Sequence, residues 1–127
     1  MQKDYRAYED ENLTIEWSYK ENSDSSVQEY FEELTLMEQK QLVTSFMIFG
    51  TTGRLYNTEK FRYEGDRIFV FKVYQYRFFC FLAQSKKIII TNAYRKKEQK
   101  ISKVEKAKAV RARALYIQRV QEGTYYE

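Results

Sequence analysis

Apolar and polar residues alternate through much of the second half of the chain, and a period of two residues predicts β-strands. The clearest segments are 67–73, 76–82 and 87–93, which are rich in aromatic and β-branched residues. Shorter strands are predicted at 13–19 and 60–63. The three long segments follow one another closely, so we expect them to form an antiparallel meander.

Three capping boxes, each a Ser or Thr followed three residues later by Glu, predict helix starts. They begin at Ser26, Thr35 and Ser102. We expect the first two helices to pack as a hairpin that ends near Gly50, and the third to continue to about Gln121. In the third helix, the residues expected to face the body are Val104, Ala107, Val110, Ala114 and Ile117.

These elements predict an α+β fold: a twisted antiparallel β-sheet of about four strands, with an N-terminal helical hairpin and a C-terminal helix. The chain has 127 residues and is 43% hydrophobic, which suits a single domain over 1–127. Residues 1–12 are interpreted as an acidic N-terminal extension, for which a flexible conformation is left open.

Charge is divided unevenly along the chain. Residues 1–50 hold four Lys and Arg against eleven Asp and Glu, whereas residues 51–127 hold eighteen against seven. A basic half favours a polyanionic partner, and nucleic acid is the commonest one. The alternative is a solvated charged surface with no partner.

The composition also excludes several chemistries. The chain has no His, and Cys80 is its one Cys, which argues against zinc or iron–sulfur sites, Cys–His nucleophiles and Ser–His–Asp triads. We therefore expect no metal and no cofactor. No apolar run has transmembrane length and the N-terminus is polar, so we expect no membrane contact and a cytoplasmic location.

Two cations on neighbouring strands give the first candidate site. A hairpin about Tyr74 and Gln75 places Lys72 directly opposite Arg77, on the face away from Phe71. Opposed cations repel, so this pairing favours an anion between them, and phosphate is the obvious one. The alternative for Arg77 is a surface ion pair with Glu64 or Glu105.

The end of the last predicted strand extends this patch. Asn92 and Tyr94 share the parity of Ile88 and Ile90, which would bring Asn92 beside Arg77. An aromatic side chain beside cations is able to stack on an unpaired base, but Tyr94 is equally suited to cap the core.

A basic run follows the strand. Arg95, Lys96, Lys97 and Lys100 place four cations within six residues, which favours contact with an RNA backbone over a merely solvated connection. Lys103 continues the run into the helix, where further cations are more typical of a solvated face.

The stretch from Ile68 to Gln118 resembles the RelE/HigB superfamily of small bacterial toxins, particularly its HigB-like, phage-associated branch. The resemblance rests on three motifs: Val70-Phe71-Lys72, Tyr76-Arg77-Phe78-Phe79, and the run from Asn92 to Lys100 before a capped helix. It covers about residues 13–118, by element order alone before residue 60. The chain has Asn92 where the family has His, Val70 where it has Glu, Tyr94 where it has Phe, and Ile101-Ser102 where Pro is frequent.

The resemblance implies a toxin of a toxin–antitoxin module: a metal-independent endoribonuclease that cleaves mRNA on the ribosome. It also implies a small antitoxin partner, often with a helix-turn-helix domain. The catalytic residues expected on this basis are Lys72, Arg77, Tyr94 and Lys97. The RNA-binding residues expected are Asn92, Arg95, Lys96, Lys100 and Lys103. Because Asn92 replaces His, two alternatives stay open: a catalytically inactive relative that binds nucleic acid or an antitoxin, and a ParE-like gyrase inhibitor.

Overall fold

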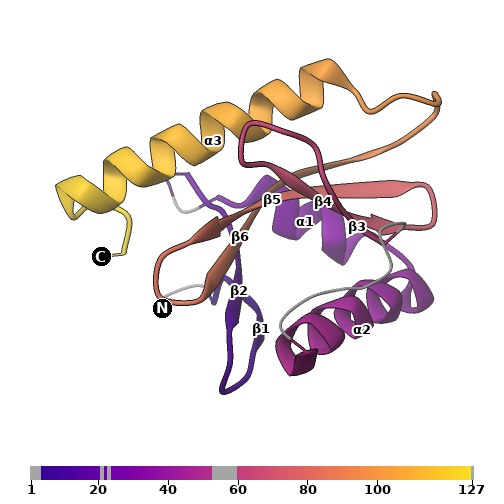
Figure 1. Cartoon of the computed structure of the whole chain (residues 1–127), viewed down its shortest axis with the longest axis horizontal. Helices are drawn as coiled ribbons and strands as arrows, with labels where there is room; N and C mark the ends of the chain where they lie inside the picture. The colour runs from indigo at the N-terminus through magenta and orange to yellow at the C-terminus, as the bar shows by residue number, and fades with distance from the viewer. Residues whose placement is uncertain (1–3, 21, 23, 53–59, 127) are drawn as a thin grey trace.

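A computed structural model describes residues 4–20, 22, 24–52 and 60–126 (Figure 1). In these residues the strands are β1 (Arg6–Glu9), β2 (Thr14–Trp17), β3 (Phe61–Tyr63), β4 (Phe69–Val73), β5 (Tyr76–Ala83) and β6 (Lys87–Arg95). The helices are α1 (Ser26–Glu32), α2 (Leu36–Thr52) and α3 (Lys103–Glu122). The predicted α+β class is confirmed. None of the helices in this part of the chain is long and apolar enough to cross a membrane.

The strands form one mixed sheet in the order β1-β2-β6-β5-β4-β3. β2 runs parallel to β6, and the other neighbouring strands are antiparallel. The prediction of an antiparallel sheet of about four strands is therefore wrong in strand number and in the direction of one pair. Alternation identifies a strand but not its neighbour, and β2 meets β6 only after two helices and two hairpins have intervened.

Part of the segment that the sequence assigned to an acidic extension is a strand. β1 pairs with β2 at the edge of the sheet, and the Tyr8 ring lies 6.5 Å from the Phe46 ring, measured between centroids. Arg6 and Glu9, at the two ends of β1, remain exposed. Glu9, the acidic residue within β1, therefore lies on the solvent side of the strand.

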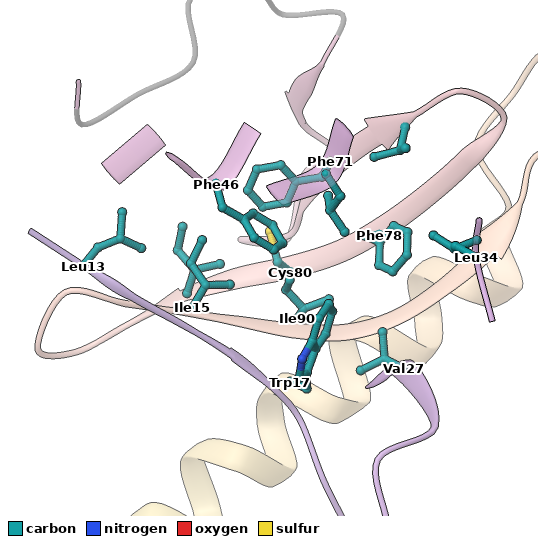
Figure 2. Close-up of a cluster of buried hydrophobic side chains, with 13 residues drawn as sticks. Leu13, Ile15, Trp17, Val27, Leu34, Phe46, Phe71, Phe78, Cys80 and Ile90 are labelled. Atoms are coloured by element: carbon teal, nitrogen blue, oxygen red, sulfur yellow. The ribbon is translucent and has the colours of Figure 1, made fainter. Parts of the chain in front are cut away.

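One face of the sheet packs against α1 and α2 (Figure 1). Figure 2 shows this core, in which Phe46 from α2 lies against Phe71 and Cys80 of the sheet, and Trp17 lies near Val27. Its buried members are Leu13, Ile15, Trp17, Val27, Leu34, Leu42, Phe46, Phe71, Val73, Phe78, Cys80, Ile88 and Ile90. Helix α1 packs on β6 and α2 on β4, so each helix of the predicted hairpin is anchored to its own strand.

The opposite face is covered by α3, which runs across the sheet in Figure 1. The buried residues here are Ile68, Val70, Phe79, Phe81, Ile89, Ala109, Tyr116 and Tyr125. The predicted inward face of α3 is wrong, because Val104, Val110 and Ile117 are exposed. The helix instead buries Ala109 and Tyr116, which are seven residues apart and therefore lie on one face. Because alanine is frequent along α3, the helix has two possible apolar faces. The face that contains the Tyr116 ring is the one that packs inward.

The helix caps follow the sequence closely. Thr35 and Glu38 exchange both hydrogen bonds of a capping box, as predicted. Ser102 caps α3 by accepting a hydrogen bond from the Glu105 N–H. The first cap is shifted by one residue, since Ser25 rather than Ser26 accepts from the Gln28 N–H while its hydroxyl donates to the Ser18 carbonyl.

Phe46 should be a main determinant of stability. Its ring is fully buried and lies 5.1 Å from the Phe71 ring and 6.4 Å from the Trp17 ring. We expect Phe46→Ala to lower the free energy of unfolding by about 3–5 kcal/mol, because it removes buried area and leaves a cavity. Met47→Ala, at the neighbouring exposed position, should change it by less than about 0.5 kcal/mol. Urea denaturation measures both; similar losses for the two variants would contradict this packing.

Candidate nucleic-acid interface

Three polar side chains stand in a row across the central strands. In the sheet register, Lys72 of β4 pairs with Arg77 of β5, and Arg77 pairs with Tyr94 of β6. Directly paired residues point to the same face of a sheet, and here it is the face covered by α3. The predicted opposition of Lys72 and Arg77 is confirmed.

A β-bulge decides what lies beside Arg77. Phe79 pairs with Asn92 but Cys80 pairs with Ile90, so Thr91 is an extra residue in β6. Ile88 and Ile90 consequently face α1 and α2, whereas Asn92 and Tyr94 lie on the α3 face. The prediction that Asn92 and Tyr94 share a face of the sheet with Ile88 and Ile90 is therefore wrong. Tyr94 rather than Asn92 pairs directly with Arg77.

Arg77 is buried, with 8% of its surface exposed. Its Nη1 donates to the carbonyl oxygens of Tyr74 and Tyr76, each at 2.9 Å, and so holds the β4–β5 turn. Burial lowers the pKa of Arg77, an effect that nearby Tyr94 partly opposes. The alternative ion pairs are not formed, because the Glu64 carboxylate pairs with Arg62 and that of Glu105 with Lys108.

Lys72 and Arg77 of this row line a pocket of about 480 Å³ between β3, β4 and the start of α3. We call it the cationic cleft. It is lined by Arg62, Glu64, Val70, Lys72, Arg77, Lys96, Gln99, Lys100, Ile101, Lys103 and Lys106. Seven of these residues are cations and one is an acid. Such an excess of positive charge in a concave site focuses the potential and attracts anions.

Lys96 contributes an amine with a lowered pKa to the cleft. It is half-buried directly after β6, where its backbone N–H donates to the Gln75 carbonyl at 2.7 Å. Its pKa is lowered, first by burial and then by the positive charges of Arg77 and Lys72. A crowded lysine of this kind gives up its proton more readily than a free one and is suited to proton transfer.

Tyr94 and Asn92 fasten the start of α3 to the sheet. The Tyr94 hydroxyl accepts a hydrogen bond of 2.8 Å from the Ser102 N–H, and its ring stacks on Phe79. The Asn92 amide donates to the carbonyl oxygen of Glu105 at 3.0 Å and to its carboxylate at 3.3 Å. The polar groups of both residues therefore have structural partners, and Asn92 does not line the cleft.

The nine predicted site residues divide among three places. Those that line the cationic cleft are Lys72, Arg77, Lys96, Lys100 and Lys103. A second depression of about 430 Å³, the outer groove, is lined by Tyr94, Arg95, Lys97, Lys100 and Lys103, among others. Lys100 and Lys103 border both, so the two form one continuous basic surface. Asn92 lines neither.

Two cations of the cleft, Arg62 and Lys106, were not predicted as site residues, and Lys106 was interpreted as part of the solvated face of the helix. Lys106 lies three residues after Lys103, on the same side of α3, and its amine pairs with Asp66 at 2.9 Å. Helical spacing was thus a usable signal for Lys106. Arg62 lies on the edge strand β3, whose pairing with β4 is not encoded in its three residues.

No protein-family model and no curated protein matches this sequence. The resemblance to the RelE/HigB superfamily therefore stays a prediction, and the chemistry of the site rests on its own geometry.

The lowered pKa of Lys96 provides a test of the cleft. We expect Lys72→Ala to raise the pKa of the Lys96 amine, because a neighbouring positive charge has been removed. Lys97→Ala, on the outer groove, should leave it nearly unchanged. Titration of the lysine side-chain resonances by NMR measures this. An unchanged Lys96 pKa in Lys72→Ala would show that the two amines do not share the cleft.

Proposed function

We propose that the cationic cleft binds the phosphate backbone of single-stranded RNA. The observation that carries this proposal is the direct opposition of Lys72 and Arg77, with Lys96 beside them. None of these three forms an ion pair with a carboxylate in the described part of the chain. Clustered cations without internal counterions are stabilised when a phosphate arrives.

RNA is favoured over duplex DNA by the shape and lining of the surface. The cleft has a volume of about 480 Å³ and continues into the outer groove, a form that suits a flexible single strand more than a rigid duplex. Exposed Arg95 and Lys97 extend the track along the outer groove. Tyr94 offers an aromatic surface there, although its other contacts hold it against Phe79.

We further propose that the protein cleaves the bound strand without a metal, as an endoribonuclease. In this reaction the ribose 2′-oxygen attacks the adjacent phosphorus, the bond to the 5′-oxygen breaks, and a 2′,3′-cyclic phosphate and a 5′-hydroxyl result. Lys72 and Arg77 would stabilise the charge that gathers on the phosphate oxygens. Lys96, in its unprotonated form, would accept the 2′-hydroxyl proton. Water would give a proton to the departing 5′-oxygen, which becomes the 5′-hydroxyl. Lys97, assigned to catalysis from the resemblance, does not line the cleft and fits RNA binding better.

The biological role we propose is that of a toxin in a toxin–antitoxin module, acting on mRNA at the ribosome. This part rests on the resemblance of the motifs from Val70 to Lys100. The expected partner is a small antitoxin, often with a helix-turn-helix domain, that is acidic where it covers the basic surface.

A second candidate function is RNA binding without cleavage, and the position of Asn92 favours it. The family's His is replaced by a side chain whose amide is tied to Glu105, so no proton-transfer group stands at that point. The two candidates share the cleft and differ in whether Lys96 is able to replace the missing base.

Substitution of Lys72 tests the enzyme. We expect Lys72→Ala to lower the rate of RNA cleavage about a hundredfold, roughly 3 kcal/mol, since it removes one charge-assisted interaction with the transition state. Lys72 has no hydrogen bond or ion pair with another described side chain, so the melting temperature should barely change. Cleavage of labelled RNA in the presence of EDTA is the measurement.

Lys40→Ala, which removes an exposed cation from α2, is the matched control and should cleave like the wild type. Equal rates for Lys72→Ala and Lys40→Ala would contradict the catalytic role of Lys72. Wild-type protein that binds RNA but leaves it intact would favour the second candidate.

The salt dependence of RNA binding tests the track itself. The double variants Lys96→Ala/Lys100→Ala and Arg95→Ala/Lys97→Ala should each flatten the plot of log K against log salt by about 1.4, because each phosphate that is no longer neutralised lowers the slope by about 0.7. Filter binding at several salt concentrations gives the slopes, with Lys40→Ala as control. Wild-type slopes in both double variants would show that these residues form a solvated surface that does not contact the RNA backbone.

A further inference from the structure

A second positively charged pocket lies beyond β6 from the cationic cleft, between α3 and the connection from β2 to α1. Its volume is about 560 Å³. Its lining residues are Ser18, Tyr19, Lys20, Asp24, Ser26, Thr91, Lys108, Arg111, Ala112, Leu115, Tyr116, Arg119 and Tyr125. We call it the Arg119 pocket. None of its residues belongs to the predicted RNA-binding or catalytic set.

Arg119 is the unusual member of this pocket, because only 7% of its surface is exposed. Its Nη2 donates to the Thr124 carbonyl at 2.8 Å, and its guanidinium lies 5.1 Å from the centre of the Tyr125 ring. Its Nε is buried and has no hydrogen-bond partner. No carboxylate in the described part of the chain forms an ion pair with it. A buried charge without a counterion is costly, so this guanidinium is prepared for an anion.

The surroundings of Arg119 add positive charge. Lys20, Lys108 and Arg111 line the same pocket, and Asp24 is the one acid among its lining residues. The Lys108 amine is paired with Glu105, but Arg111 is exposed and forms no ion pair with a described residue. Arg111 and Arg119 therefore both line the pocket, and each has guanidinium N–H groups without a hydrogen-bond partner among the described residues. Planar guanidinium groups suit the tetrahedral oxygens of phosphate.

From these observations we propose that the Arg119 pocket is a second anion site, which binds the phosphate group of a nucleotide. Its volume lies in the range of small-molecule pockets. Ala112, Leu115 and Tyr116 supply an apolar wall for the rest of the ligand. The phosphate would come either from a free mononucleotide or from the 5′-end of an RNA strand. This inference does not depend on RNA cleavage in the cationic cleft.

Isothermal titration calorimetry at constant ionic strength tests the site with three probes: inorganic phosphate, adenosine monophosphate and a 5′-phosphorylated RNA oligomer. We expect adenosine monophosphate to bind a saturable site whose affinity falls at least tenfold in Arg111→Ala. Lys40→Ala, which also removes one exposed helical cation, should bind as the wild type does. Lys72→Ala should also bind adenosine monophosphate normally, because it alters the other cleft.

The Arg119 guanidinium gives a direct readout that needs no variant. Its Nε–Hε resonance should shift during a titration with phosphate in ¹⁵N NMR spectra. Arg119→Lys, which keeps the charge but loses the planar fork, should weaken binding, and its far-ultraviolet circular dichroism shows whether it is folded. Loss of RNA affinity in Arg111→Ala only when the oligomer carries a 5′-phosphate would identify the RNA end as the source; unchanged RNA affinity together with weaker binding of adenosine monophosphate would identify the free nucleotide.

Three results would overturn the proposal. They are the absence of saturable binding by both phosphate-bearing nucleotides, equal affinity in Arg111→Ala and wild type, and a loss of affinity in Lys72→Ala that Arg111→Ala does not share. The last result would assign the anion to the cationic cleft.

Discussion

One extra residue in β6 determines the candidate site. Thr91 forms a bulge, so that Ile88 and Ile90 face α1 and α2 while Asn92 and Tyr94 face α3. With regular pairing, these two side chains would lie on the opposite face, away from Arg77. The bulge thereby completes the row of Lys72, Arg77 and Tyr94, and it also presents the groups that bind the start of α3. The position of α3, and with it the contribution of Lys103 to the cleft, depends on this local irregularity.

The cleft assembles like charges that the fold must hold together. Cations directly opposed on neighbouring strands destabilise a sheet by a few tenths of a kcal/mol up to about 1 kcal/mol. Arg77 compensates locally, because its Nη1 binds the carbonyl oxygens of the turn, where Tyr74 adopts a left-handed conformation with φ of 53°. The pKa of Lys96 is lowered first by burial and then by the positive charges of Arg77 and Lys72. The hydrogen bonds of Arg77 do not neutralise the positive charge of the cleft, so the site keeps its attraction for an anion.

The sequence predicted what local patterns determine. Alternation around the Tyr74-Gln75 turn gave the register of Lys72 and Arg77, and Ser102 and Thr35 were placed as caps because capping depends on residues three positions apart. Non-local features were not predictable in this way. The parallel pairing of β2 with β6 depends on the path of the chain, and the bulge at Thr91 leaves no composition signal. The inward face of α3 was missed because packing, and not periodicity alone, selects between two apolar stripes.

The uneven charge along the sequence becomes a difference between the two faces of the sheet. The acidic first half supplies α1 and α2 on one face, whereas the basic second half supplies α3 and the cationic cleft on the other (Figure 1). A polyanion that approaches is therefore repelled from the first face and attracted to the second, which orients it before contact. Because the cleft and the Arg119 pocket lie along the same helix, a single strand drawn toward α3 meets positive charge at both. The separation of charge thus favours one direction of approach, and the pockets beside α3 are the places where we propose that phosphate binds.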